Sequence, residues 1–334
     1  MSIFTINRRY SGAAGISLAL LLYFGGVHSG VAAHDLLVVK GNPGQASFQT
    51  EIDAIAKLWC DAAEKGGHRL ALLEGKGQET QLEWLRAELQ RLAGSGVDPV
   101  WLVLLGHGNA QGHTPKFALE GPDLAADELA RLLSKIRRPL VIVAGFSCSG
   151  AFVQPLAGPD RILLTATRSG QEENWTHFSK FFASAISSLD ADRDADGQVS
   201  VFEAWLHACG EVEAFYRVGG RMLTEHALLD DQGGGKGWDH SALDPSAKTA
   251  SKTASSTGAG VNARQRYLLP SPMEAALNDA QRARRQLLEA ELAALRPQKG
   301  KDDPQVYRDS LERILLELNS IYAEVERGAA GHSN

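Results

Sequence analysis

Short apolar runs alternate with segments of helical spacing along residues 36–189. The runs are bounded by turn residues and contain few polar positions, which is typical of strands buried on both faces of a parallel sheet. The segments between them place apolar residues three or four positions apart, as amphipathic helices do. This alternation predicts an α/β fold with a doubly wound, mainly parallel sheet, right-handed crossovers and helices on both faces. The predicted strands are residues 36–39, 70–73, 100–105, 140–144 and 162–167.

Two clusters of turn residues follow the third and fourth apolar runs directly. Residues 106–108 are Gly-His-Gly, and residues 147–150 are Ser-Cys-Ser-Gly. Ligands of open α/β sheets bind at the carboxyl ends of the strands, so we expect His107 and Cys148 to lie side by side at that edge. A thiol becomes a nucleophile when a base takes its proton, and acyl transfer also needs donors for the oxyanion. The pattern therefore indicates Cys148 as nucleophile, His107 as base, and the N–H groups of Gly108 and Cys148 as oxyanion donors.

Residues 192–203 match the twelve-residue calcium loop of an EF-hand at each diagnostic position. Gly197 allows the sharp turn of such a loop, and Val199 is its inward apolar residue. Because the loop stands alone, we expect one structural Ca²⁺ ion that braces the fold. The predicted ligands are the carboxylates of Asp192, Asp194, Asp196 and Glu203, the backbone carbonyl of Gln198, and Ser200 through a water molecule.

Residues 1–33 have the pattern of a secretory signal peptide. Two arginines precede an apolar stretch over residues 13–27, which is shorter than the roughly 20 residues that a membrane span needs. Small residues ending at Ala33 form a cleavage site that would leave His34 as the new terminus. We therefore expect a secreted or periplasmic protein with no stable membrane span after cleavage, the alternative being an uncleaved anchor.

Charge and cysteine content narrow the functional classes. A net charge of −6 argues against a nucleic-acid partner. The cysteines are Cys60, Cys148 and Cys209, and an odd number leaves at least one thiol unpaired in an oxidising compartment. Cys60 and Cys209 fall in apolar helical patterns, so we expect them to be core residues and not a disulfide.

The composition changes after the α/β domain. Gly, Ser, Ala, Thr and Lys dominate much of residues 233–264, which predicts a flexible linker. One helical pattern then begins at a capping box at Ser271 and ends before Pro297, and a second begins at Pro304 with apolar heptad positions. We expect a helical hairpin or a coiled coil through which the chain self-associates. The predicted parts are the signal peptide (1–33), the α/β domain (34–232), the linker (233–264) and the helical tail (265–328).

The strand-end clusters give the sequence a family resemblance. An apolar strand ending in His-Gly (107–108), another ending in Cys-Ser-Gly (148–150) and the strand order around them resemble the caspase-like fold of clan CD cysteine peptidases, most closely the legumain family. The resemblance covers roughly residues 35–220. It implies a cysteine endopeptidase that acts on protein or peptide substrates. It also implies that residues 164–169 help to line the specificity pocket and that Asn42 lies behind the histidine as an orienting residue.

Two registers are open for the nucleophile. The caspase pattern Cys-x-Gly places the family cysteine on Cys148, whereas the legumain pattern Cys-x-Ser-Gly places it on Ser147. A shift of one residue in a strand turns the side chain to the other face. The acidic residue that legumain-type sequences carry two places before the cysteine is missing, so asparagine specificity is not predicted. Secreted bacterial sequences that are similar over residues 166–170 and in the calcium loop have another residue in place of the cysteine.

Two functions follow from these observations. The first is a secreted, calcium-binding cysteine endopeptidase with His107 and Cys148 as its dyad, His113 being a competing base farther into the loop. The second is a catalytically inactive, caspase-like, calcium-binding scaffold that recruits a protein partner. Glu172 and Glu173 form either an acidic pocket for a basic side chain or a solvated helix start.

Overall fold

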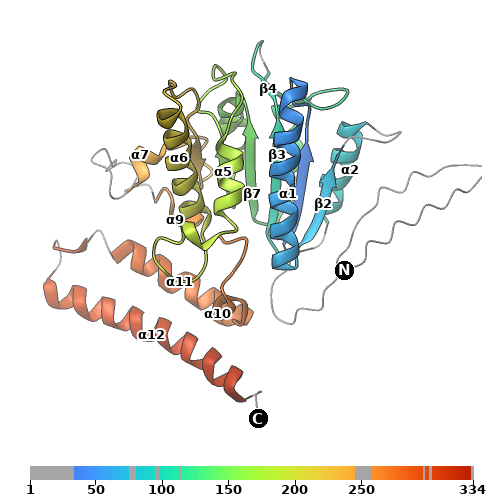
Figure 1. Cartoon of the computed structure of the whole chain (residues 1–334). Coiled ribbons are helices and arrows are strands. Elements are labelled where there is room, and N and C mark those ends of the chain that lie inside the picture. The colour runs from blue at the N-terminus through green and yellow to red at the C-terminus, as the bar shows by residue number, and fades with distance from the viewer. Residues whose placement is uncertain are drawn as a thin grey trace, which may run out of the picture.

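The computed structural model describes residues 34–74, 80–94, 96, 98–112, 114–244, 258–295, 298–300 and 303–331 (Figure 1). In this part of the chain, six strands form one sheet in the order β2-β1-β3-β7-β8-β9, and β9 alone runs antiparallel to its neighbour. The strands are β1 (Asp35–Lys40), β2 (Arg69–Leu73), β3 (Val100–Gly106), β7 (Leu140–Phe146), β8 (Arg161–Thr165) and β9 (Leu228–Asp230). The predicted doubly wound, mainly parallel sheet is confirmed.

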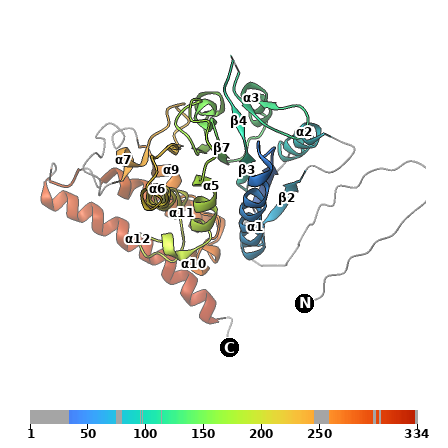
Figure 2. The ribbon, with the colours of Figure 1, turned by 45° about the horizontal axis from the view of Figure 1, so that its top comes forward.

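Helices cover both faces of the sheet (Figures 1 and 2). Alternate residues of one strand enter two separate cores: Leu36 and Val38 face one side of the sheet, and Leu37 and Val39 face the other. On the first side lie α1 (Gln49–Gly66), α5 (Phe178–Ala185) and α6 (Val201–Val218). On the second side lie α2 (Gln81–Leu92), α3 (Ala126–Leu133) and α4 (Val153–Leu156). The central strands β3 and β7 are buried along their whole length, as their unbroken apolar runs predict.

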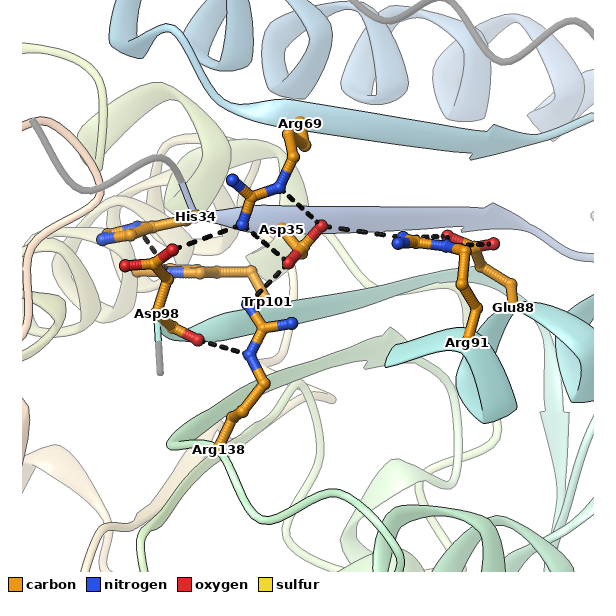
Figure 3. Close-up of polar contacts among 8 residues, drawn as sticks. All are labelled: His34, Asp35, Arg69, Glu88, Arg91, Asp98, Trp101 and Arg138. Atoms are coloured by element: carbon orange, nitrogen blue, oxygen red, sulfur yellow. Dashed lines mark hydrogen bonds and ion pairs between the residues drawn. The ribbon is translucent and has the colours of Figure 1, made fainter. Parts of the chain in front are cut away.

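An ion network is buried where the parallel strands begin (Figure 3). Asp35, the first residue of β1, is 3% exposed and accepts hydrogen bonds from Arg138 at 2.5 Å and from Arg69 at 2.9 and 3.0 Å. Burial disfavours the charged form of Asp35, but the two arginines outweigh it and lower the pKa of this carboxyl. Asp98 contacts the same two arginines, Arg69 through its carboxylate and Arg138 through its carbonyl. Both arginines thus have anionic partners at this edge.

A small antiparallel sheet follows β3 directly. It consists of β4 (Gly108–Asn109), β5 (Lys116–Phe117) and β6 (Leu124–Ala125). The Phe117 ring packs on Phe146 at the end of β7, with their centroids 4.7 Å apart. This contact holds the backbone at Gly108 against the carboxyl end of β7.

The C-terminal helices α11 (Asp279–Leu295) and α12 (Pro304–Gly331) form an antiparallel hairpin. Gln281 at the start of α11 bonds to Glu324 near the end of α12, and Glu291 near the end of α11 bonds to Arg313. The hairpin is one of the two predicted arrangements, and self-association stays a prediction. The Ser271 cap starts only the short helix α10 (Pro272–Ala275), because Asn278 caps a new helix three residues later.

Part of the segment predicted as a linker packs on the core. Residues 245–257 lie outside the described residues, but residues 261–264 form helix α9. The carboxylate of Asp231, itself 2% exposed, accepts hydrogen bonds from the N–H groups of Gly260 and Ala263 at 2.9 and 3.0 Å. The partner that holds α9 therefore lies about 30 residues earlier in the chain, so local composition carries no sign of it.

The shortest elements were not predicted. Strand β9 spans three residues and strands β4, β5 and β6 span two each, too few for a periodic signal. Within the described residues, no helix combines the length and apolar character that crossing a membrane requires.

Candidate functional site

The topology brings His107 and Ser147 together at the carboxyl edge of the sheet. Strands β3 and β7 are parallel neighbours with Gly106 opposite Phe146, so the next residue of each strand lies at the same level. The Oγ atom of Ser147 lies 2.8 Å from Nδ1 of His107, within hydrogen-bond distance. Of the two registers open from sequence, the structure brings Ser147 against the histidine.

The Ser147 hydroxyl has further partners on the backbone of Gly108. The Gly108 N–H donates to Oγ at 3.1 Å, and Oγ lies 3.3 Å from the Gly108 carbonyl oxygen. A Cβ at position 108 would lie 2.3 Å from the Ser147 carbonyl oxygen, so only glycine permits this approach. Ser147 is 1% exposed, whereas His107 is half-buried. Access from solvent to the pair is therefore on the histidine side.

Cys148 has a different environment from Ser147. Its backbone has φ of +60°, which turns the chain between the end of β7 and the following 3-10 turn (Ser149–Phe152). Its N–H donates to the Glu172 carbonyl oxygen at 2.8 Å. Burial raises the pKa of the Cys148 thiol, which is opposite to the shift that a thiolate nucleophile needs. Among the described residues, no hydrogen bond joins Cys148 to His107, and the competing base His113 lies outside them.

Asn42 lies behind His107 and contacts its backbone. The Asn42 carbonyl accepts a hydrogen bond from the His107 N–H at 3.0 Å, and its side chain accepts one from the Gly44 N–H at 2.8 Å. Gly44 has φ of +75°, and a Cβ there would lie 3.2 Å from the His107 ring. The turn after β1 thus forms a close backing for the imidazole, and it lies where the strand order reverses between β1 and β3.

The turn after Ser147 is tied to the segment that follows β8. Ser149 Oγ accepts hydrogen bonds from the N–H groups of Ala166 and Thr167, and Thr167 Oγ1 accepts one from the Gly150 N–H. A Cβ on Gly150 would lie 2.2 Å from the Arg168 backbone. The segment that the resemblance assigns to the specificity pocket is therefore in direct contact with the turn that carries Ser147.

Arg168, whose backbone packs against Gly150, also lines a cavity of about 370 Å³ whose polar lining includes Glu225 and His226. Glu172, predicted as a pocket acid or a solvated helix start, bonds to His226 Nδ1 at 2.6 Å and to Arg168 at 3.1 Å. Glu225 is 2% exposed and accepts hydrogen bonds from the N–H groups at the start of α5. Burial raises the pKa of Glu225 to about 7. Sequence inspection missed Glu225, because its partners lie almost 50 residues away.

The acidic loop holds its carboxylates close together. Oxygen atoms of Asp192, Asp194 and Asp196 all lie within 4.8 Å of one another. The Gly197 N–H donates to Asp192 Oδ2 at 3.0 Å, while Oδ1 is buried with no hydrogen-bond partner. Burial and then the neighbouring carboxylates raise the pKa of Asp194. An orphaned buried oxygen among crowded carboxylates fits a hard divalent cation such as Ca²⁺.

The other predicted ligands lie at the end of the loop. Glu203 and Ser200 form a reciprocal capping box at the start of α6, and Glu203 also accepts a hydrogen bond from the Arg193 N–H at 2.9 Å. The Gln198 side chain accepts a hydrogen bond from the Ser271 N–H at 3.0 Å. The loop therefore contacts both the core helix α6 and the start of the helical tail.

Comparison with known proteins gives distant structural matches. No family model matches the chain, and no curated protein matches it in sequence. The structure is similar to the Drosophila initiator caspase Dronc, with 11% identity, a TM-score of 0.37 and coverage of 61% of this chain and 81% of that one. It is also similar to caspase-1 from Spodoptera frugiperda, with 12% identity, a TM-score of 0.39 and coverage of 60% and 86%. Similarity at this level says nothing about which residues act.

Proposed function

We propose that this chain is a secreted, calcium-binding hydrolase of peptide bonds with a caspase-like fold, in which Ser147 is the nucleophile and His107 its base. The observation that supports it is the 2.8 Å contact between Ser147 Oγ and His107 Nδ1 at the carboxyl edge of the sheet. A nucleophile and a base within hydrogen-bond distance are the minimal arrangement for acyl transfer. In this proposal the nucleophile is Ser147, the alternative register of the sequence analysis, in place of the thiol of Cys148.

The reaction would proceed through an acyl-enzyme. Ser147 Oγ attacks the carbonyl carbon of the peptide while its proton passes to His107 Nδ1. The carbonyl oxygen becomes an oxyanion, and the Gly108 N–H would pass from Oγ, which becomes the weaker ester acceptor, to this oxygen. The second predicted donor, the Cys148 N–H, is already bonded to the Glu172 carbonyl and would not take part. His107 then gives its proton to the leaving amine, and a water molecule hydrolyses the ester by the same steps in reverse.

A specific observation favours a second candidate, the catalytically inactive scaffold. Ser147 is 1% exposed, and the partners of its hydroxyl are all internal groups of the chain. A hydroxyl held in this way also serves as a structural link between β3 and β7. In that case the carboxyl edge would bind a protein partner without cleaving it.

Covalent probes distinguish the two candidates. We expect a fluorophosphonate to label the wild-type protein and Cys148→Ala, but not Ser147→Ala or His107→Asn. Labelling by a thiol-directed peptide ketone that disappears in Cys148→Ala and persists in Ser147→Ala would instead identify the thiol as nucleophile. A folded wild-type protein that neither reagent labels would reject the hydrolase in favour of the scaffold.

The same proposal includes one structural Ca²⁺ ion and export. The residues that would hold the ion are Asp192, Asp194, Asp196 and Glu203, with Gln198 and Ser200 completing the loop. Export is supported by the pattern of residues 1–33, which lie outside the described residues. Amino-terminal sequencing of protein recovered from the periplasm or medium should begin at His34, and a sequence that retains the apolar stretch would contradict cleavage.

A further inference from the structure

The edge of the sheet opposite His107 contains two arginines that form no ion pair within 4 Å in the part of the chain that the structure describes. Arg161 is the first residue of β8, and Arg266 follows α9. Both line a polar cavity of about 120 Å³ between the starts of β7 and β8 and the helices α9 and α11. This volume is several times the roughly 10–15 Å³ that one water molecule needs.

Neither arginine donates a hydrogen bond to an anionic group among the described residues, and the carboxylate that acts on Arg266 through space is the exposed Asp160. Arg161 donates to the carbonyl oxygen of Leu156 at 2.8 Å, which satisfies one N–H but supplies no negative charge. The Nε atom of Arg266 is buried and has no hydrogen-bond partner. Burial lowers the pKa of both guanidinium groups, because the charged form is desolvated.

The same edge shows how this protein pairs a buried arginine elsewhere. Arg69 and Arg138 both bind the carboxylate of Asp35, at 2.9 and 2.5 Å (Figure 3). Leaving a desolvated cation unpaired costs more than pairing it, and two half-buried guanidinium groups at one cavity therefore favour an anion between them. No ion pair of Arg161 or Arg266 occurs among the described residues.

The neighbouring groups define the chemistry of the missing anion. Asn262, Gln265 and Gln286 also line the cavity, and their amides add neutral donors to the two guanidinium forks. The acidic residue in the lining is Asp160. Its side chain is exposed, so solvent screens its repulsion of a bound anion. The charged groups near Arg266 also include His34, whose pKa is lowered by burial and by adjacent cations, among them Arg266.

We propose that Arg161 and Arg266 form a binding site for a small tetrahedral oxyanion, of which inorganic phosphate and sulfate are the accessible forms. Planar guanidinium groups bind such oxygens in pairs, and a small polar cavity that is partly open to solvent admits a small anion. Gln286 belongs to α11, so the bound anion connects the starts of β7 and β8 to the tail hairpin. This site is independent of the hydrolase proposed above and lies at the other end of the sheet.

Calorimetric titration of the full-length mature protein with phosphate tests the site, with sulfate and acetate as parallel arms at constant pH and ionic strength. We expect saturable binding of phosphate and sulfate, at least ten-fold weaker binding of planar acetate, and at least ten-fold weaker phosphate binding in Arg161→Gln and Arg266→Gln. Arg137→Gln is the matched control, because Arg137 is exposed and outside the cavity. Its phosphate affinity should equal that of the wild type.

Asp160→Asn provides a test in the opposite direction. Removing the opposing carboxylate should tighten phosphate binding, and asparagine tolerates the φ of +55° at this position. If Arg266→Gln fails to fold, the phosphate affinities of Arg161→Gln and Asp160→Asn still test the site. Absence of saturable binding by the wild type, unchanged affinity in Arg161→Gln, or weaker binding in Asp160→Asn would overturn the proposal.

Discussion

Ser147 and Cys148 are adjacent, equally buried and chemically different. Each is 1% exposed, but the hydroxyl contacts an imidazole nitrogen and a backbone N–H, whereas burial disfavours ionisation of the thiol. Reactivity at a strand end depends on such contacts more than on the intrinsic nucleophilicity of the atom. At the scale of single residues, the local environment therefore supports the Ser147 hydroxyl as the proposed nucleophile, although a thiol such as that of Cys148 is intrinsically more nucleophilic.

Glu225 should make stability depend on pH. Its folded pKa of about 7 lies above the ordinary carboxyl value of 4.5, so its stabilising contribution is complete below about pH 4.5 and is lost as the pH rises towards 7. Glu225→Gln removes this loss. Between pH 4.5 and 7.5 the unfolding free energy of the wild type should fall relative to that of the variant by up to roughly 3 kcal/mol, at 1.36 kcal/mol per pKa unit.

Urea denaturation at several pH values measures this difference. Glu173→Gln is the control, because Glu173 is an exposed carboxyl in the neighbouring segment. The control should follow the wild type at every pH. A constant difference between the wild type and Glu225→Gln would show that Glu225 is ionised in the folded protein throughout this range.

The sequence predicts where the candidate site lies but not which side chain occupies it. Turn residues after two central apolar runs place His107 and residues 147–150 at one edge, because parallel strands end at the same side of a sheet. The choice between Ser147 and Cys148 depends on the backbone at Cys148, whose φ is +60°. Non-glycine residues adopt this conformation uncommonly, so residue preferences do not predict it.

At the scale of elements, contacts between distant segments explain which parts of the fold the sequence pattern does not predict. Each of the five apolar runs contains a strand, because the central runs are apolar enough to be buried on both faces; the edge strand β2 is only partly buried, and β8 ends at Thr165, two residues before its predicted end. The end of the acidic loop (residues 192–203) instead pairs with a distant segment: Ser200 forms a bridge with Tyr267, and the Val201 N–H bonds to the Arg266 carbonyl at 2.8 Å. Nothing near the loop in sequence indicates this partner.

Calcium should stabilise the whole protein through this loop. We expect the thermal midpoint to rise by several degrees in millimolar Ca²⁺, because an ion that binds only the folded state stabilises it by mass action. Asp192→Asn should lose most of the rise. Asp190→Asn is the matched control, since Asp190 is exposed and precedes the loop.

Differential scanning fluorimetry with and without a chelator provides the measurement. The Asp190→Asn midpoint should respond to calcium as the wild type does. An Asp192→Asn midpoint that rises as much as that of the wild type would reject the loop as the calcium site.

At the scale of the whole molecule, the carboxyl and amino edges of the sheet differ in the kind of side chains that they hold. The carboxyl edge holds the half-buried His107 beside Ser147, whereas an ion network centred on the buried Asp35 and Arg138, with the half-buried Arg69, lies at the amino edge. Such pairs contribute little beyond a hydrophobic replacement, but removing one partner leaves the others uncompensated. The amino edge is therefore the more sensitive to single substitutions.

Asp35→Ala should lower the free energy of unfolding by about 3 kcal/mol, because it leaves the buried Arg138 and the half-buried Arg69 without their shared carboxylate. Asp98→Asn should cost less, since the side chain of Asp98 is 28% exposed and its contact with Arg69 is 3.4 Å long. Guanidinium denaturation of both variants at pH 7 gives the comparison. Equal losses of unfolding free energy in the two variants would show that the burial of Asp35 does not increase its contribution to stability.

The hydrogen bonds from the Gly260 and Ala263 N–H groups to the Asp231 carboxylate join parts of the chain on either side of residues 245–257. Leu268 is fully buried in the same core, and the Arg266 carbonyl belongs to the pairing at the start of α6. Covalent continuity through residues 245–257 is therefore not what attaches the tail to the α/β domain. Cleavage by a protease within residues 245–257 would therefore yield two chains that stay assembled through these contacts.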